Sequence, residues 1–150
     1  MHVVLQRVTS ASVVVDGATV GAIEHGVLLL VGVEAGDQEA DADALVRKIA
    51  ALRIFPGRTP MDRSLADVEG GCLVVSQFTL AATVRKGNRP GFDKAEDPAR
   101  AEALYLRVAE GLRGAGLPVA TGVFGAHMDV ALVNDGPVTL LLRARDGRIQ

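Results

Sequence analysis

The chain has 150 residues, 49% of them apolar, and a formal net charge of −2. This length suits a single domain over residues 1–150, which buries about 68–70% of its unfolded surface and needs no metal or disulfide to hold a core. The near-neutral charge excludes a general basic coat for nucleic acid, so any RNA contact has to be local.

The first third of the chain is predicted to be rich in strands. β-Branched runs at residues 3–8 and 12–15 precede an Asp16-Gly17 turn, and residues 18–23 form a plausible return strand. Residues 27–33 are apolar on both faces, which is typical of a central, buried strand.

A helix is predicted next, with Asp37 as its N-cap and with acidic residues in its first turn, where the helix dipole favours them. Apolar residues recur at helical spacing and define one buried face: Ala42, Leu45, Val46, Ile49 and Leu52. Ile54-Phe55 suits a short strand, and residues 56–71 read as a long surface loop.

The second half alternates strands with one clear helix. A strand is expected at residues 72–78 and an irregular polar segment at residues 83–97. Asp97 followed by Pro98 marks a helix start, with the helix running to about Gly114. Three further strands are predicted at residues 119–124, 130–133 and 138–142, before a frayed tail at residues 143–150. The pattern predicts an α+β domain, with two main helices packed on a mixed β-sheet.

Several kinds of functional site are excluded by the sequence. The chain has no Gly-x-Ser-x-Gly elbow, no P-loop and no dinucleotide-binding glycine pattern. Its histidines, His2, His25 and His127, show no metal-ligand spacing, so neither a metal nor a cofactor is expected. The only cysteine, Cys72, lies in an apolar run and is expected to be a buried, unreactive thiol.

The N-terminal residues show no signal sequence, and no apolar run reaches the ~18–20 residues that span a bilayer. The sequence therefore predicts a cytoplasmic protein without a membrane segment.

Polar residues interrupt an apolar strand at Ser76-Gln77-Phe78-Thr79-Leu80. One interpretation is a hydrogen-bonded polar patch at a strand end. The other is a pocket wall, with Gln77 and Thr79 on one face by strand alternation and backbone N–H groups available to a developing oxyanion. The residues alone favour neither interpretation.

Asp135-Gly136-Pro137 lies between two apolar runs. Proline cannot donate to a sheet ladder, and glycine permits backbone shapes that other residues avoid. From these residues alone an ordinary turn is favoured. The alternative is a rigid dipeptide whose carbonyls point toward a ligand.

Both motifs, in this order, resemble those of the D-aminoacyl-tRNA deacylase family. The resemblance covers nearly the whole chain, and it extends to four further segments, namely Gln6 to Val13, Arg53-Ile54-Phe55, Gly87 to Pro90 and Gly122 to Met128. It implies a homodimer whose sheets meet at the interface. It also implies a hydrolase that cleaves the ester between a D-amino acid and the 3′-terminal ribose of tRNA, and that removes glycine mischarged on tRNA-Ala.

The resemblance also assigns roles to residues. Gly136 and Pro137, in the cis form, would reach into the active site of the other subunit and reject L-amino acids. The active-site wall would comprise Gln77, Phe78 and Thr79, supported by Ser76. Arg7 would brace the Gly-Pro pair, and Asn134 would be a further supporting residue. Catalysis would rest on the RNA and on the N–H of Phe78 or Thr79, with Thr79 as nucleophile a less favoured alternative because no base is placed to activate it.

A basic cluster of Arg85, Lys86, Arg89 and Lys94 suggests contact with the 3′ acceptor end of tRNA, with the first three as the expected contacts, although it also suits a solvated loop. Two departures from the family are Gly91, where a serine is common, and Leu140, where an aromatic residue is common.

Two alternatives remain open. One is a paralogous deacylase with a trans Gly-Pro bond that acts on small L-aminoacyl-tRNA, and the other is a non-catalytic nucleic-acid-binding protein of the same fold.

Overall fold

The computed structural model describes all residues from Met1 to Gln150. One curled sheet has the strand order β5-β4-β3-β1-β6-β7, with β2 paired to β1. The strands are β1 (His2–Val15), β2 (Ala18–Ile23), β3 (Gly26–Gly32), β4 (Gly71–Ser76), β5 (Val119–Thr121), β6 (Asp129–Arg145) and β7 (Arg148–Ile149).

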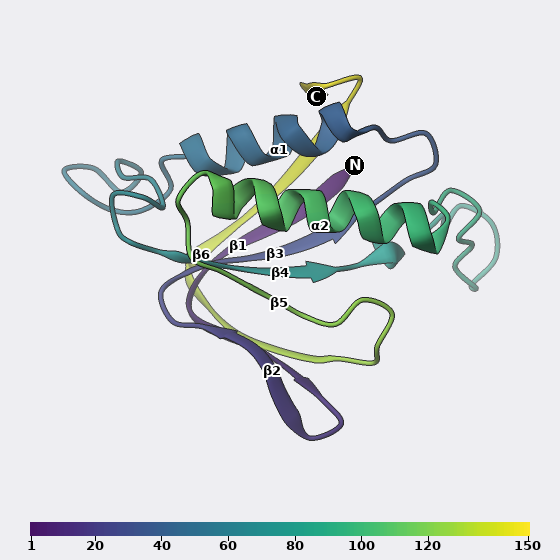
Figure 1. Ribbon diagram of the computed structural model, residues 1–150, viewed down its shortest axis with the longest axis horizontal. Helices are drawn as coiled ribbons and strands as arrows, with labels where there is room; N and C mark the ends of the chain where they lie inside the picture. The colour runs from purple at the N-terminus through teal and green to yellow at the C-terminus, as the bar shows by residue number, and fades with distance from the viewer.

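Two helices, α1 (Glu39–Ala51) and α2 (Pro98–Gly114), lie side by side over one face of the sheet (Figure 1). The pairs β3–β4 and β4–β5 are parallel, whereas the other pairs, including β1–β3, are antiparallel. The predicted α+β class, with a mixed sheet and two packed helices, is confirmed.

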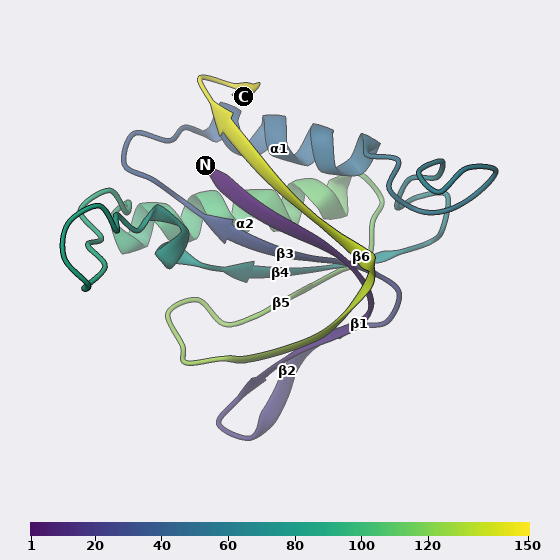
Figure 2. The ribbon, with the colours of Figure 1, turned by 180° about the vertical axis from the view of Figure 1, so that it is seen from behind.

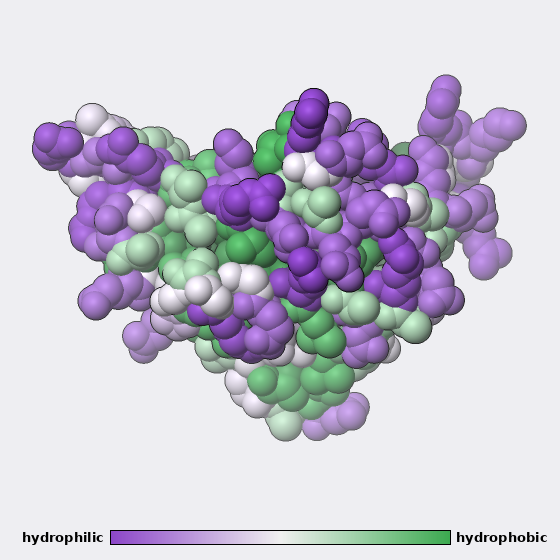
Figure 3. Space-filling model, turned by 45° about the horizontal axis from the view of Figure 1, so that its top comes forward, coloured by the Kyte–Doolittle hydropathy of each residue, from purple (hydrophilic) through white to green (hydrophobic).

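The main core fills the space between the sheet and the helices. Inward-facing residues of the central strands, such as Val3, Leu29 and Val74, meet Leu45 of α1 and Val108 of α2. A smaller cluster on the opposite face forms where the curled ends of β1 and β6 fold back over Leu28 and Leu73. Figure 2 shows β1 and β6 in front of the helices, and Figure 3 shows apolar residues gathered near β2, at the lower end of the molecule.

Cys72 is fully buried in the main core, as predicted, and burial raises the pKa of its thiol to about 12. It therefore stays protonated and unreactive at neutral pH. None of the helices is long and apolar enough to cross a membrane.

Both long strands differ from the prediction, because each is continuous where two separate strands were expected. β1 keeps its pairing with β6 through register shifts between Gln6 and Ser10. β6 contains Gly136-Pro137 within its length, so the expected turn is instead a bulge. A bulge adds residues to one strand without ending its ladder, and local sequence does not distinguish it from a turn.

The end of the chain is also ordered, and the prediction of a frayed tail was wrong. β6 continues to Arg145, β7 pairs back on it, and Ile149 packs against the main core. The Nη1 atom of Arg145 lies 3.0 Å from Oδ1 of Asp37, which is fully buried.

Asp37 is not the N-cap of α1, which begins one residue later with Gln38 as its cap. The Asp37 carboxylate instead contacts the buried α-amine of Met1 at 2.7 Å and accepts a hydrogen bond from the N–H of Glu34 at 2.7 Å. The capping role passes to Asp41, whose carboxylate accepts from the Gln38 N–H at 2.8 Å. The Asp37 carboxylate therefore forms a long-range ion pair, although the local sequence pattern predicted that it would cap the helix.

Replacing Asp37 by Asn should lower the free energy of unfolding by about 3–5 kcal/mol, because the buried amine of Met1 would lose its countercharge. Urea unfolding followed by circular dichroism measures the change. The matched control is Asp43→Asn, whose ion pair with Arg107 lies on the helix surface and contributes little. Equal effects of the two substitutions would contradict a special role for the Asp37 cluster.

Candidate active site

The segment after β4 leaves the sheet earlier than predicted. β4 ends at Ser76, the N–H of Gln77 donates to the carbonyl of Val31 at 2.8 Å, and residues Phe78–Ala81 form a 3₁₀ turn. The turn packs on Gly32, where an added Cβ would lie 2.7 Å from Cβ of Leu80. The expected strand alternation of Gln77 and Thr79 is therefore wrong, because Gly32 on the neighbouring strand gives the turn room to form.

Gln77 and Thr79 nevertheless come together, because Nε2 of Gln77 donates to Oγ1 of Thr79 at 2.6 Å. An amide nitrogen is not a base, so this contact orients the hydroxyl without activating it as a nucleophile. The first N–H groups of a helical turn have no partner within the turn. The N–H groups of Phe78 and Thr79 are thus suited to stabilise negative charge on a ligand.

Ser76, Gln77 and Phe78 line a cleft of about 750 Å³. Its other walls come from the polar loop before α2, the start of α2 and the segment between β5 and β6, with Phe92, Pro98, Phe124, His127 and Met128 among the lining residues. The rings of Phe78 and Phe92 lie 5.0 Å apart, and 56% of Phe78 is exposed. An open cleft with exposed aromatic rings can stack a planar group.

Sequence reasoning missed the walls beyond Phe78. The sequence feature that could have indicated these walls is an aromatic residue within a polar loop, namely Phe92. His127 lies on the rim of the cleft with its side chain almost fully exposed. No group of three or more histidine, cysteine, aspartate or glutamate side chains is close enough to hold a metal ion.

Gly136-Pro137 is the tip of a bulge on β6. Gln6 pairs with Thr139 and Val8 with Asn134, so the four residues from Asp135 to Val138 lie opposite Arg7 alone. The Gly136-Pro137 peptide is cis, and both residues are exposed. Gly136 has φ +133°, in a region that side-chain-bearing residues rarely adopt.

Two side chains hold this bulge in place. Arg7 is almost completely buried, and its Nε donates to the carbonyl of Asp135 at 3.0 Å while its Nη1 donates to the carbonyl of Ile54 at 2.5 Å. Oδ1 of Asn134 accepts from the N–H of Val138 at 2.8 Å, and its Nδ2 donates to Oγ1 of Thr139 at 2.8 Å. The bulge is therefore fixed at its first carbonyl and across its base.

The bulge and the Ser76–Thr79 segment do not meet within one chain. Arg7 is level with Val27 and Cys72 across the sheet, and Ser76 lies four residues farther along β4. Three strand spacings separate β6 from β4, so the two motifs lie roughly 20 Å apart. The structure thus brings together Ser76, Gln77, Phe78 and Thr79 in one place, and Arg7, Asn134, Gly136 and Pro137 in another.

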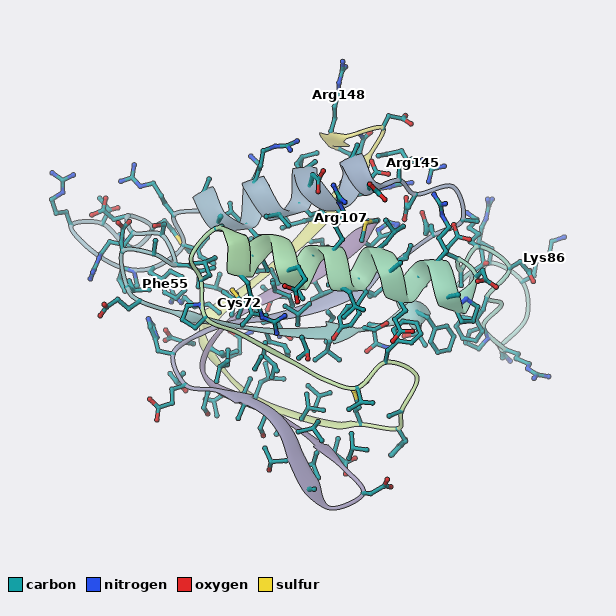
Figure 4. The ribbon with its side chains drawn as sticks, in the orientation of Figure 1. Phe55, Cys72, Lys86, Arg107, Arg145 and Arg148 are labelled. Carbon is teal, nitrogen blue, oxygen red and sulfur yellow. The ribbon has the colours of Figure 1, made fainter.

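The basic loop lies near the cleft, beyond the 3₁₀ turn. Thr83 and Gly91 pair through two backbone hydrogen bonds of 2.8 and 2.9 Å, which close the loop at its base. Arg85, Lys86 and Arg89 line a polar hollow of about 630 Å³ together with Asp93. None of the three cations forms an ion pair within the chain, and Lys86 points outward at one end of the molecule (Figure 4).

Comparison with known proteins identifies the family. A sequence model described as D-Tyr-tRNA(Tyr) deacylase matches residues 4–143. The chain belongs to this deacylase family. It is 59% identical to the D-aminoacyl-tRNA deacylase of Thermomicrobium roseum, over 99% of this chain and 97% of the relative. It is 53% identical to that of Halalkalibacterium halodurans, over 97% of this chain and the full relative.

Solved structures share the fold of the chain. A structure described as c-Myc DNA Unwinding Element Binding Protein superposes with a TM-score of 0.89 at 40% identity, covering 97% of this chain and 99% of the other. A probable eukaryotic D-amino acid tRNA deacylase has the same fold, with a TM-score of 0.78 at 20% identity and coverage of 93% and 97%. The family resemblance seen in the sequence is confirmed, and so is the expectation of a hydrolase that acts on ester bonds.

In this deacylase, Thr79→Ala should reduce the single-turnover rate by less than about tenfold, because Thr79 lacks a base. Loss of a true nucleophile would cost on the order of 10⁴-fold or more. Rapid-quench hydrolysis of D-Tyr-tRNA measures the rate, with circular dichroism as the check on folding. A folded Thr79→Ala protein with no measurable turnover would make Thr79 a chemical participant.

Proposed function

We propose that this chain hydrolyses the ester bond of D-aminoacyl-tRNA and of glycine mischarged on tRNA-Ala, and that it rejects L-aminoacyl-tRNA. Water adds to the ester carbonyl, the bond to the 3′ oxygen of the ribose breaks, and that oxygen takes a proton as tRNA leaves. The products are free tRNA and the amino acid. Family membership and the open cleft beside Phe78 support this assignment.

The bulge at Gly136-Pro137 is the observation that carries the chiral part of the proposal. It presents backbone to solvent at the glycine, and Arg7 and Asn134 hold it in place. A rigid backbone group placed where an L side chain would project excludes that side chain by contact. A D side chain would point elsewhere, and glycine has none, so both would be admitted without any recognition of side-chain identity.

A second copy of the chain is needed if Gly136-Pro137 is to exclude L-amino acids; we call this dipeptide the chiral filter. The bulge lies roughly 20 Å from the cleft of its own chain, so it can act only in the cleft of another. The sheet face away from the helices carries an apolar row across four strands, formed by Leu141, Val4, Leu30 and Val75 in register. Leu141 is 81% exposed, and Val75 borders the cleft. We therefore propose a homodimer in which these faces meet.

Catalysis would depend on the backbone and on the substrate. The N–H groups of Phe78 and Thr79 would donate to the carbonyl oxygen as it gains negative charge, and Gln77 would hold the Thr79 hydroxyl in place. Ser76 would support this wall from the end of β4. The vicinal ribose hydroxyl would orient the attacking water, so no side-chain nucleophile is required.

The basic loop would contact phosphates of the acceptor end. Arg85, Lys86 and Arg89 have no internal carboxylate partners, and their loop adjoins the segment that lines the cleft. Local cations suit a chain whose overall charge is slightly negative, because they attract RNA only where the ester must be delivered.

Two other functions are possible alternatives, and assays with D- and L-aminoacyl-tRNA test both. A paralogous deacylase with a trans Gly-Pro bond would act on small L-aminoacyl-tRNA, whereas the Gly136-Pro137 bond of this chain is cis. The second alternative is a non-catalytic nucleic-acid-binding protein, and one relative in structure, 40% identical, is described as binding a DNA unwinding element. That relative is the observation in favour of this alternative.

We expect the purified protein to hydrolyse D-Tyr-tRNA at least about 100-fold faster than L-Tyr-tRNA, since a steric clash exceeds the discrimination available from one methylene. Glycyl-tRNA-Ala should also be cleaved. Release of radiolabelled amino acid measures each rate, with L-Ala-tRNA as the matched small substrate. Preferential cleavage of L-Ala-tRNA would favour the paralogue, and cleavage of none would favour the binding protein.

Reversing the charge of both Arg85 and Lys86 to Glu should weaken tRNA binding and reduce the dependence of log kcat/KM on log salt by about 1.4–1.8, for two lost phosphate contacts. The single-turnover rate at saturating tRNA should change little. Measurements between about 50 and 200 mM salt cover the useful range. An unchanged salt slope would make this loop an ordinary solvated surface.

A further inference from the structure

The loop that follows Ile54 is attached to the Gly136-Pro137 bulge. Arg7 donates to the carbonyl of Ile54 through Nη1 and to the carbonyl of Asp135 through Nε, so one buried side chain joins both segments. The next residue, Phe55, is fully buried and pairs with Arg63 through hydrogen bonds of 3.0 and 2.9 Å. The loop and the bulge are therefore parts of one rigid corner of the molecule.

The tip of this loop is built around Asp62. Its Oδ2 accepts from the N–H of Arg58 at 2.8 Å and its Oδ1 accepts from Nη2 of Arg53 at 2.6 Å. The hydrogen bond from the Arg58 N–H, followed by that from Arg53, lowers the pKa of the Asp62 carboxyl, so it stays ionised at neutral pH. This clamp fixes the backbone at Arg58 although the tip lies in solvent.

The Arg58 side chain is left free by the same arrangement. It is 91% exposed, and its one carboxylate neighbour is Asp62, at 3.7 Å from Nε. An exposed ion pair of this length contributes little and is readily exchanged for another anion. A planar guanidinium on a fixed backbone matches the geometry of a phosphate group.

This corner lies far from the chain's own cleft loop. Figure 4 shows Phe55, where the loop begins, in the left half of the molecule and Lys86, in the basic loop, at the right end. If Gly136-Pro137 enters the cleft of a second copy, the loop at residues 55–70 must come close to that copy as well, because Arg7 joins the loop to the bulge. The loop would then face the RNA bound to that second copy.

We propose that Arg58 of one subunit binds a phosphate of the tRNA acceptor end whose ester lies in the cleft of the other subunit. The inference rests on the proposed function and extends it. Each substrate is held by cations of both chains, namely Arg85, Lys86 and Arg89 from the subunit that supplies the cleft and Arg58 from the subunit that supplies the bulge. Delivery of the acceptor end is thereby coupled to correct docking of the chiral filter.

The first test compares Arg58→Ala with Arg148→Ala in the full-length protein. Arg148 is an equally charged, exposed residue that points away from both sites (Figure 4). Arg58→Ala should raise KM for D-Tyr-tRNA about fivefold, as expected for loss of one exposed ion pair. It should also reduce the slope of log kcat/KM against log salt by about 0.7–0.9, for one phosphate. The kcat of the variant and both parameters of Arg148→Ala should stay at wild-type values.

The second test decides which subunit Arg58 serves. Subunits carrying Arg58→Glu are paired with subunits carrying Arg85→Glu and Lys86→Glu, and the heterodimer is isolated through two different affinity tags. If Arg58 acts across the interface, one site of the heterodimer has every cation intact, and kcat/KM per dimer returns to about half of wild type. If Arg58 serves its own cleft, both sites are damaged and no recovery occurs.

The outcomes separate this inference from the proposed function. Wild-type protein that hydrolyses D-Tyr-tRNA, together with Arg58→Ala at wild-type KM and salt slope, overturns the inference alone. Lack of recovery in the heterodimer overturns its cross-subunit part. Wild-type protein that hydrolyses no D-aminoacyl-tRNA overturns both.

Discussion

The buried guanidinium of Arg7 is the contact on which the functional geometry depends. It projects from the middle of β1 and donates to backbone carbonyls of Asp135 and Ile54, which lie far apart in the sequence. Its contact with the Asp135 carboxylate, at 3.2 Å, adds a countercharge. Hydrogen bonds from a charged donor are stronger than neutral ones, and leaving a buried carbonyl unpaired is costly. A single side chain therefore fixes the bulge on β6 and the loop after Ile54 to the sheet.

The proposed chemistry needs no side-chain nucleophile. Cys72 is buried and protonated, Thr79 is oriented by an amide, and no cluster of metal-ligating side chains is present. What remains are backbone donors beside an open cleft and a backbone projection at Gly136-Pro137. Such groups cannot drift as side chains do, which suits discrimination between enantiomers that differ only in the placement of one substituent.

Local patterns predicted the elements whose formation depends on neighbouring residues. The apolar run of β3, the Asp97-Pro98 start of α2 and the buried Cys72 all agree with the structure. Predictions were wrong where contacts with residues far away in the sequence determined the local structure. Asp37 caps no helix because the Met1 amine and Arg145 take its carboxylate, and β4 stops at Ser76 because Gly32 lets the 3₁₀ turn pack against β3. The tail is ordered for the same reason, since Arg145 and Ile149 find partners outside their own segment.

The sequence by itself determined the fold class and the family, because the periodicity of its apolar residues and its two polar motifs are local properties of the chain. Only the tertiary structure decided that Gly136-Pro137 is a bulge within one strand and that it lies far from Ser76 to Thr79 of the same chain. Both results depend on strand register, which is set by pairing between distant segments. The separation of the two motifs is what makes a second subunit part of the proposed site.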